Sequence, residues 1–75
     1  MKPRKITVWW NDACSPSKHW IYPDDIDKKP DRIVTRGWLV ADTKRAIVVC
    51  HSLSRYQYGN PLTIPKSAIR KRRDK

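Results

Sequence analysis

The stretch Lys5–Trp10, KITVWW, alternates polar and apolar side chains and ends in two adjacent tryptophans. Successive side chains of a β-strand point to opposite faces, so this alternation predicts a strand with one buried face. Ile6 and Val8 then lie on the same face as Trp10, which we expect to be a core residue. Trp9 lies on the opposite, polar face and is expected to be a surface aromatic. A one-residue bulge in this strand would exchange the two tryptophans.

A long loop is predicted to follow this strand, because residues 11–31 contain three prolines and five of the seven aspartates of the chain. Proline suits the first position of a helix and acidic residues favour that end, so one short 3₁₀ or α turn is expected over Pro23–Lys28. The apolar side chains of this loop are expected to hold it against the rest of the domain. They are Trp20, Ile21, Tyr22 and Ile26.

Three further strands are expected in residues 32–41, 44–53 and 62–64, which are rich in β-branched residues. Gly37 interrupts the first of these and indicates a bulge or a close approach of two backbones. The apolar triplet Ile47–Val49 predicts a strand covered on both faces. A loop is expected between the last two runs, over SRYQYGNP.

The chain is expected to end in one helical turn, PKSAI, whose Ala68 and Ile69 fold back on the core. From Arg70 onward we expect a charged, frayed tail. The fold class is therefore all-β, a small barrel of about five strands with a long first loop and a C-terminal 3₁₀ turn. One domain is expected over residues 1–75, with the barrel core at 6–69 and basic tails at 1–5 and 70–75.

The formal net charge is +10, from 17 lysines and arginines against seven acidic residues. An excess of this size favours an acidic partner, either nucleic acid or an acidic protein surface. Neither a signal peptide nor a membrane-spanning run is present, which predicts a soluble, cytoplasmic protein with no membrane partner. The sequence leaves open whether the protein is a monomer or a small homo-oligomer.

The sequence favours neither a metal site nor an enzyme. Cys14, His19, Cys50 and His51 are the candidate zinc ligands, but adjacent residues of a strand point to opposite faces, so Cys50 and His51 do not converge. The expected state of both cysteines is a free thiol. The acidic cluster of residues 24–27 is interpreted as a solvated loop. Two glycines cannot build a phosphate-binding loop, and no oxyanion loop accompanies a Cys–His or Ser–His pair, so no catalytic residue and no cofactor is predicted.

Aromatic rings combined with cations carry the prediction of a binding surface, because rings stack on bases or on partner side chains and cations hold phosphates. Trp10 and Trp38 are assigned to the core, since a domain of this size has few large apolar residues to spare. The other aromatic residues, together with basic residues of the loops and the C-terminus, form the predicted binding set. Its members are Trp9, Trp20, Tyr22, Arg36, Lys44, Arg45, Arg55, Tyr56, Tyr58, Arg70, Lys71, Arg72 and Arg73.

Two resemblances to known groups of proteins add to this interpretation of the sequence. The motifs GWLV (37–40), AIVVCHS (46–52) and GNPLTIPKSAI (59–69) resemble the second half of an SH3-like barrel, with the long first loop corresponding to the RT loop. The set formed by Trp10-x-Asp12-Ala13, GWLV and IPKSAI (64–69) resembles small, mostly uncharacterised proteins of tailed bacteriophages.

The phage resemblance implies an accessory protein of phage origin that acts in the bacterial host cytoplasm, and the lack of a catalytic constellation predicts that it is not an enzyme. Such a protein would bind a host protein or nucleic acid through a basic, aromatic-rich face and so modulate or inhibit a host process. An alternative is a protein that sequesters a nucleotide or cyclic nucleotide and thereby counters host defence.

Overall fold

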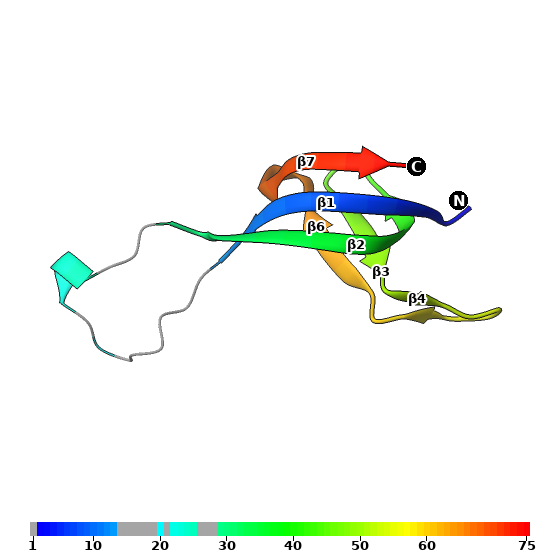
Figure 1. The fold of residues 1–75 in the computed structure, drawn as a ribbon, viewed down its shortest axis with the longest axis horizontal. Helices are drawn as coiled ribbons and strands as arrows, with labels where there is room; N and C mark the ends of the chain where they lie inside the picture. The colour runs from blue at the N-terminus through cyan, green and yellow to red at the C-terminus, as the bar shows by residue number, and fades with distance from the viewer. Residues whose placement is uncertain (1, 14–19, 21, 26–28) are drawn as a thin grey trace.

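The computed structural model describes residues 2–13, 20, 22–25 and 29–75. It contains a five-stranded antiparallel sheet and a separate two-stranded hairpin (Figure 1). In the sheet, the strands lie in the order β6 (Leu62–Pro65), β3 (Ala46–Cys50), β2 (Asp31–Asp42), β1 (Arg4–Asp12) and β7 (Ile69–Asp74). The hairpin pairs β4 (Ser52–Leu53) with β5 (Tyr58–Gly59), and the 3₁₀ turns are η1 (Pro23–Asp25) and η2 (Lys66–Ala68).

The all-β prediction and the C-terminal 3₁₀ turn are confirmed. The edge strands are β6 and β7, and in the part of the chain that the structure describes they do not pair with each other, so the sheet is open. None of the helices in that part has the length and apolar composition needed to cross a membrane.

Strand β1 lies between β2 and β7 and supplies three side chains to the core. Ile6, Val8 and Trp10 are buried, as the alternation predicts, whereas Trp9 is half-buried on the opposite face. The Trp10 indole Nε1 donates a hydrogen bond of 2.9 Å to the buried Thr35 Oγ1. The indole therefore adds a large apolar area to the core without leaving its polar atom unpaired. The other strands complete the core with Leu39, Ile47, Val49 and Ile64.

Two irregularities bend the sheet without disturbing β1. Between β1 and β7 the register passes from Trp9 opposite Lys71 to Trp10 opposite Ile69, so the extra residue belongs to β7. Between β2 and β3 the register also shifts by one residue, between Leu39 and Ala41. Because neither extra residue lies in β1, its alternation persists and the two tryptophans keep their predicted faces.

Residues 70–74 form most of strand β7, and the expected frayed tail is therefore wrong. β7 pairs with β1 over Ile6–Trp10, and the backbone N–H of Lys75 donates a further hydrogen bond to the Lys5 carbonyl at 3.0 Å. The run of charges suggested a solvated end, but β1 offers a row of backbone hydrogen-bonding groups on the side away from β2. Pairing these groups outweighs the cost of gathering the cations.

Five charged residues form a chain of ion pairs that joins β7 to the end of β2 and to η2. Asp74 pairs with Arg4 at 2.9 Å and with Arg72 at 2.6 Å, while Asp42 pairs with Arg72 at 3.2 Å and with Lys66 at 2.7 Å. Hydrogen bonds from Arg72 and Arg4 lower the pKa of the Asp74 carboxyl to about 2. The Lys66 hydrogen bond is the main cause of a lowered pKa at Asp42.

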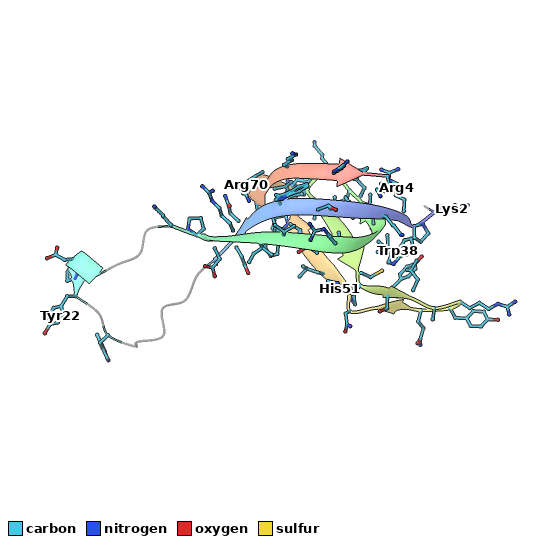
Figure 2. All side chains as sticks on the ribbon, in the orientation of Figure 1. Lys2, Arg4, Tyr22, Trp38, His51 and Arg70 are labelled. Atoms are coloured by element: carbon cyan, nitrogen blue, oxygen red, sulfur yellow. The ribbon has the colours of Figure 1, made fainter. Side chains whose placement is uncertain are left out.

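The long loop after β1 contains the short turn η1, which confirms the helical turn expected at Pro23 as far as Asp25. Trp20 is 92% exposed and Tyr22 is 79% exposed, so the expectation that they hold the loop against the domain is wrong. Figure 2 shows Tyr22 at one end of the molecule, far from Trp38. Ile21 and the segment 26–28 lie outside the described residues.

The run 44–53, expected as one strand, is divided between two sheets. β3 ends at Cys50, and the chain continues through His51 into the hairpin, where the expected SRYQYGNP loop contains β5. Ser54 closes the turn, because its backbone N–H donates to the Gln57 carbonyl at 2.9 Å and its Oγ accepts a hydrogen bond of 2.9 Å from the Gln57 N–H. The triplet in β3 is buried at Ile47 and Val49 and half-buried between them.

Candidate functional site

Three strands, β2, β1 and β7, present one side of the sheet away from the core. Residues directly opposite each other in antiparallel strands share a face, so the register identifies the side chains of this surface. The backbone hydrogen bond from Lys75 to Lys5 extends the same register by one row. We call this surface the outer face; its residues are Lys5, Thr7, Trp9, Asn11, Arg32, Val34, Arg36, Trp38, Lys71, Arg73 and Lys75.

Both tryptophans of the outer face lie beneath a lysine. Lys71 Nζ is 5.0 Å from the centroid of the Trp9 ring, and Lys5 Nζ is 5.5 Å from the centroid of the Trp38 ring. Each contact is a cation–π interaction, formed by residues that sit directly opposite each other in neighbouring strands. Both rings are half-buried, so each is fixed in the sheet while part of its surface stays open to solvent.

Trp38 was expected in the core, and its place on the outer face corrects that assignment. The alternation of the strand accounts for this place, because Thr35 and Leu39 are four positions apart and both point inward. Trp38 is an odd number of positions from both of these residues and therefore points outward. Its size, which suggested a core residue, does not override the alternation.

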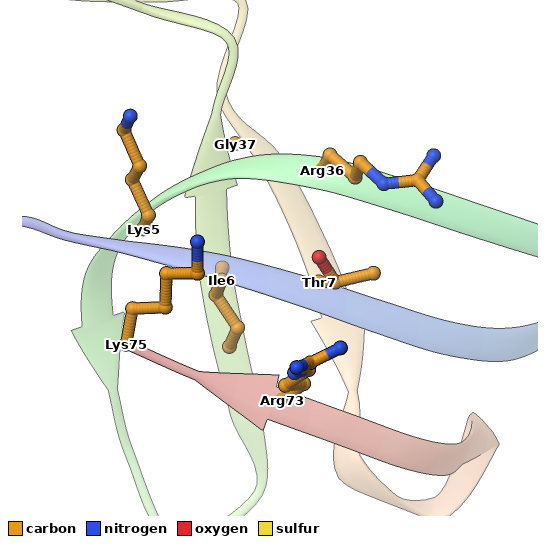
Figure 3. A pocket seen from close by; sticks show the side chains of 7 residues that line it. All are labelled: Lys5, Ile6, Thr7, Arg36, Gly37, Arg73 and Lys75. Carbon is orange, nitrogen blue, oxygen red and sulfur yellow. The ribbon is translucent and has the colours of Figure 1, made fainter.

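A groove of about 490 Å³ opens in the outer face at the row that contains Thr7. Figure 3 shows Thr7 on β1 between Arg36 on β2 and Arg73 on β7, which its register also places directly opposite. Lys5 and Lys75 line the same groove, and the remaining lining residues are uncharged. Four cations, one each from β1, β2 and β7 and one from Lys75 directly after β7, therefore line the groove together with Thr7, and none of the lining residues is acidic.

A second hollow, of about 480 Å³, lies at the other end of the same strand. It is lined by Asn11, Lys29, Pro30, Arg32 and Arg70, so it is also basic. The side-chain oxygen of Asn11 is buried and has no hydrogen-bond partner among the residues described. The row between the groove and the second hollow contains Trp9.

The ion pairs of the structure leave the outer face with a surplus of positive charge. Asp42 and Asp74 are the carboxylates of the described ion pairs, and their partners are Arg4, Lys66 and Arg72. None of these five residues belongs to the outer face. The potential above the outer face is consequently positive, which attracts anionic groups.

The structure brings together only part of the predicted binding set. Trp9, Arg36, Lys71 and Arg73 lie on the outer face, and Arg70 lines the second hollow beside it. Arg72 belongs to the opposite face, where it pairs with two carboxylates.

The remaining members of the set lie elsewhere and do not form one surface with the outer face. Arg55, Tyr56 and Tyr58 belong to the β4–β5 hairpin, Lys44 and Arg45 to the turn after β2, and Trp20 and Tyr22 to the long loop. Figure 2 shows the hairpin and the labelled Tyr22 at opposite ends of the molecule. The prediction omitted Lys5, Arg32, Trp38 and Lys75, which the strand register adds to the outer face.

The candidate zinc ligands do not come together in the described part of the chain. Cys50 is a buried free thiol and His51 is exposed, whereas Cys14 and His19 lie outside the described residues. Among the described residues, no group of three or more His, Cys, Asp or Glu side chains has a geometry that could hold a metal ion.

Comparisons with protein-family models, with curated proteins and with solved structures found no match. The outer face is therefore the feature of the molecule from which we infer a function. Its cations can hold phosphate or carboxylate groups, and its rings can stack on planar ligands.

Proposed function

We propose that the protein binds nucleic acid through its outer face. The observation that carries the proposal is the groove at Thr7, which is lined by Arg36, Arg73, Lys5 and Lys75 without an acidic residue among the lining side chains. Phosphate groups supply the charge that such a surface lacks, and arginine holds phosphate through two parallel hydrogen bonds.

The ring contacts support nucleic acid over a partner that offers charge alone. An exposed cation–π contact such as that of Lys71 with Trp9 is worth about 0.5–1 kcal/mol. Stacking of a base on an aromatic side chain contributes about 1–3 kcal/mol. A base can therefore displace the lysine from the ring, and the released ammonium group is then free to contact a phosphate.

The test is a fluorescence anisotropy titration of labelled DNA and RNA at low salt. A double variant, Arg36→Ala with Arg73→Ala, is expected to lower the affinity at least 10-fold, because it removes both arginines that flank Thr7. The matched control is Lys44→Ala with Arg45→Ala, which removes the same charge from the turn after β2 and should change the affinity less than threefold. Equal losses in the two variants would show that net charge, and not the outer face, controls binding.

An acidic host protein is the competing partner, and a tagged pull-down from bacterial lysate with and without nuclease separates the two. Capture that disappears with nuclease supports nucleic acid. Capture of one stoichiometric protein despite nuclease, together with no binding of oligonucleotides, would overturn the proposal.

The size of the groove favours a second candidate function, the sequestration of a nucleotide or cyclic nucleotide. Small-molecule sites commonly enclose about 300–1,000 Å³, and the groove at Thr7 is of this size. A thermal-shift screen against mononucleotides and cyclic nucleotides at millimolar concentration tests it. A stabilisation that is lost in the Arg36→Ala and Arg73→Ala double variant would support this candidate, and no shift would reject it.

We further propose that the sheet is an opened relative of the SH3-like barrel. The long loop between β1 and β2, and the turn η2 immediately before the last strand, support this proposal. Nucleic-acid binding by so small a domain suits a bacteriophage accessory protein that acts on a host process, which is the role we propose for it.

A further inference from the structure

Along β1, the side chains of the outer face form rows across the neighbouring strands, and two kinds of row alternate. Lys5 lies opposite Trp38, Thr7 opposite Arg36 and Arg73, and Trp9 opposite Lys71. The next row holds Asn11 opposite Arg32. Ring-bearing rows therefore alternate with rows whose charge comes from arginine, and consecutive rows are about 6.6–6.8 Å apart.

We propose that the ligand is a single strand of nucleic acid that runs along β1. Bases stack on Trp38 and Trp9, which are two rows apart, and the phosphates on either side of the nucleotide between them sit in the groove at Thr7. The row spacing is comparable with one sugar–phosphate repeat of an extended single strand of nucleic acid. Successive nucleotides can therefore align with successive rows of the outer face. This inference rests on the proposed function and specifies its ligand.

The second hollow continues the same path beyond Trp9. Arg32 and Arg70 line it and can take the next phosphate along the strand. From Lys5 to Asn11 the path measures about 20 Å. The contacting segment is therefore about four nucleotides long, at the short end of the range for small single-strand-binding domains.

A duplex does not fit the rings in this way. Its bases are stacked on one another in the interior, so it offers the outer face only its phosphates. Trp9 and Trp38 are half-buried within a sheet surface and cannot reach between paired bases as an exposed wedge could. A single strand, whose bases are free, uses both the rings and the cations of the face.

The experiment compares a ten-nucleotide oligothymidine with a hairpin duplex of equal charge, both fluorescently labelled, at one fixed low salt concentration. The wild-type protein is expected to bind the single strand at least 10-fold more tightly. Trp9→Ala is expected to weaken single-strand binding roughly 5- to 100-fold and to change duplex binding less than twofold. Trp9→Tyr, which keeps an aromatic ring, should restore most of the affinity, and circular dichroism should show both variants folded.

Trp20→Ala is the matched control, because Trp20 is an exposed tryptophan of the long loop and belongs to no strand of the outer face, and it should leave both affinities unchanged. In a length series, affinity should rise steeply up to about four nucleotides and slowly beyond that.

Tighter binding of the duplex, or loss of single-strand affinity in Trp20→Ala but not in Trp9→Ala, would overturn the single-strand inference. The proposed function would still hold after either of those outcomes if nucleic-acid binding depends on Arg36 and Arg73. Failure to bind either ligand would instead reject the proposed function.

Discussion

Trp10 fills the core with the largest side chain available and pairs its only polar atom with Thr35. Trp9, its neighbour in the chain, contributes to a different surface. The two residues have the same chemistry, and only the direction of the side chain separates their roles. Substitutions at these positions should therefore have opposite consequences for folding and for binding.

Trp10→Ala is expected to destabilise the fold by about 3–5 kcal/mol, because it leaves a cavity and removes the hydrogen bond to Thr35. A domain of this length has a total stability of roughly 4–11 kcal/mol, so the loss is a large share of the total and the urea midpoint should fall steeply. Trp10→Phe should retain most of the core packing and should therefore lower the free energy of unfolding by less than Trp10→Ala does. Urea unfolding followed by circular dichroism measures both, and Trp9→Ala should remain folded. Unfolding by Trp9→Ala instead would contradict the strand register.

Gly37 allows β2 and β3 to approach closely. A Cβ atom at this position would lie 2.9 Å from Val49 Cγ1 and would overlap the Cys50 carbonyl oxygen. Gly37→Ala is therefore expected to lower the free energy of unfolding by about 1–3 kcal/mol. Gly59→Ala is the comparison: its Cβ would make a tight contact of 3.0 Å with Ser52 Cβ but would lie 3.6 Å from the Ser52 carbonyl oxygen, so a smaller loss is expected. Equal urea midpoints for the two variants would argue against a close approach at Gly37.

The sequence predicts individual faces well where alternation is strong and poorly where residue size is the guide. The polar–apolar pattern of Lys5–Trp10 correctly assigns Trp9 and Trp10. Trp38 was misassigned because its bulk suggested burial, although Leu39 beside it already occupied the inward position. Neither Trp20 nor Tyr22 could be placed from the sequence, since what an aromatic loop residue packs against depends on tertiary contacts.

At the scale of elements, the chain of ion pairs joins the last strand to the rest of the domain. Arg72 of β7 reaches Asp42 at the end of β2, and Asp42 also holds Lys66 of η2. Arg4 of β1 and Arg72 share Asp74. The carboxylates that stabilise the attachment of β7 are therefore few, and their protonation should weaken it.

The free energy of unfolding should fall as the pH is lowered from about 4 towards 2. The pKa of Asp74 is about 2 in the folded protein and has its ordinary value of 3.8 in the unfolded chain. The unfolded state therefore takes up the proton first, and the stabilisation present above the ordinary pKa is lost as the pH falls through the folded value. The pairs are partly exposed, so the loss at Asp74 should not exceed about 1 kcal/mol.

Urea midpoints measured between pH 2 and 6 test this dependence. Asp74→Asn should be less stable at neutral pH and should show a flatter profile below pH 4. Asp24→Asn, in the exposed turn η1, should keep the wild-type profile. A wild-type profile in the Asp74 variant would show that this carboxyl does not contribute to the attachment of β7.

Strand β7 shows why charge pattern is a weak guide to secondary structure. RKRRDK is typical of a solvated end, and no apolar alternation marks it as a strand. Its place in the sheet follows from the backbone hydrogen-bonding groups of β1 that would otherwise face solvent. The local sequence of residues 70–75 contains no information about these groups. The same reasoning explains why Lys75 was missed, since it joins the outer face only through the pairing of β7 with β1.

At the scale of the whole molecule, the charge is separated between the two sides of the sheet. The described ion pairs lie on the core side, at the rim, and the outer face keeps cations from β1, β2 and β7 without a carboxylate among its residues. The net charge of +10 predicted an anionic partner. The sequence could not show which surface would carry the surplus, because that depends on which cations the few aspartates neutralise.

Binding of single-stranded nucleic acid should weaken log-linearly with salt, with a slope of about −3 if each of the four nucleotides in the contacting segment has its phosphate neutralised by a cation. The double variant of Arg36 and Arg73 should reduce the magnitude of that slope by about 1.4, and the Lys44 and Arg45 variant should leave it unchanged. Anisotropy titrations between about 50 and 200 mM salt measure the slopes. If the double variant of Arg36 and Arg73 has the same slope as the wild-type protein, the phosphates do not bind in the groove at Thr7.

The pairing of β7 with β1 also determines how readily proteases can cleave the C-terminal segment. Every peptide bond after Arg70, Lys71, Arg72 and Arg73 is of the type that trypsin-like enzymes cleave. A protease requires an extended segment free of its sheet, so these bonds are accessible only when β7 detaches. Removal of the segment would expose the edge of β1 and strip cations from the outer face in one event. Limited proteolysis therefore reports the attachment of this strand directly, and a bound ligand on the outer face should slow the cleavage.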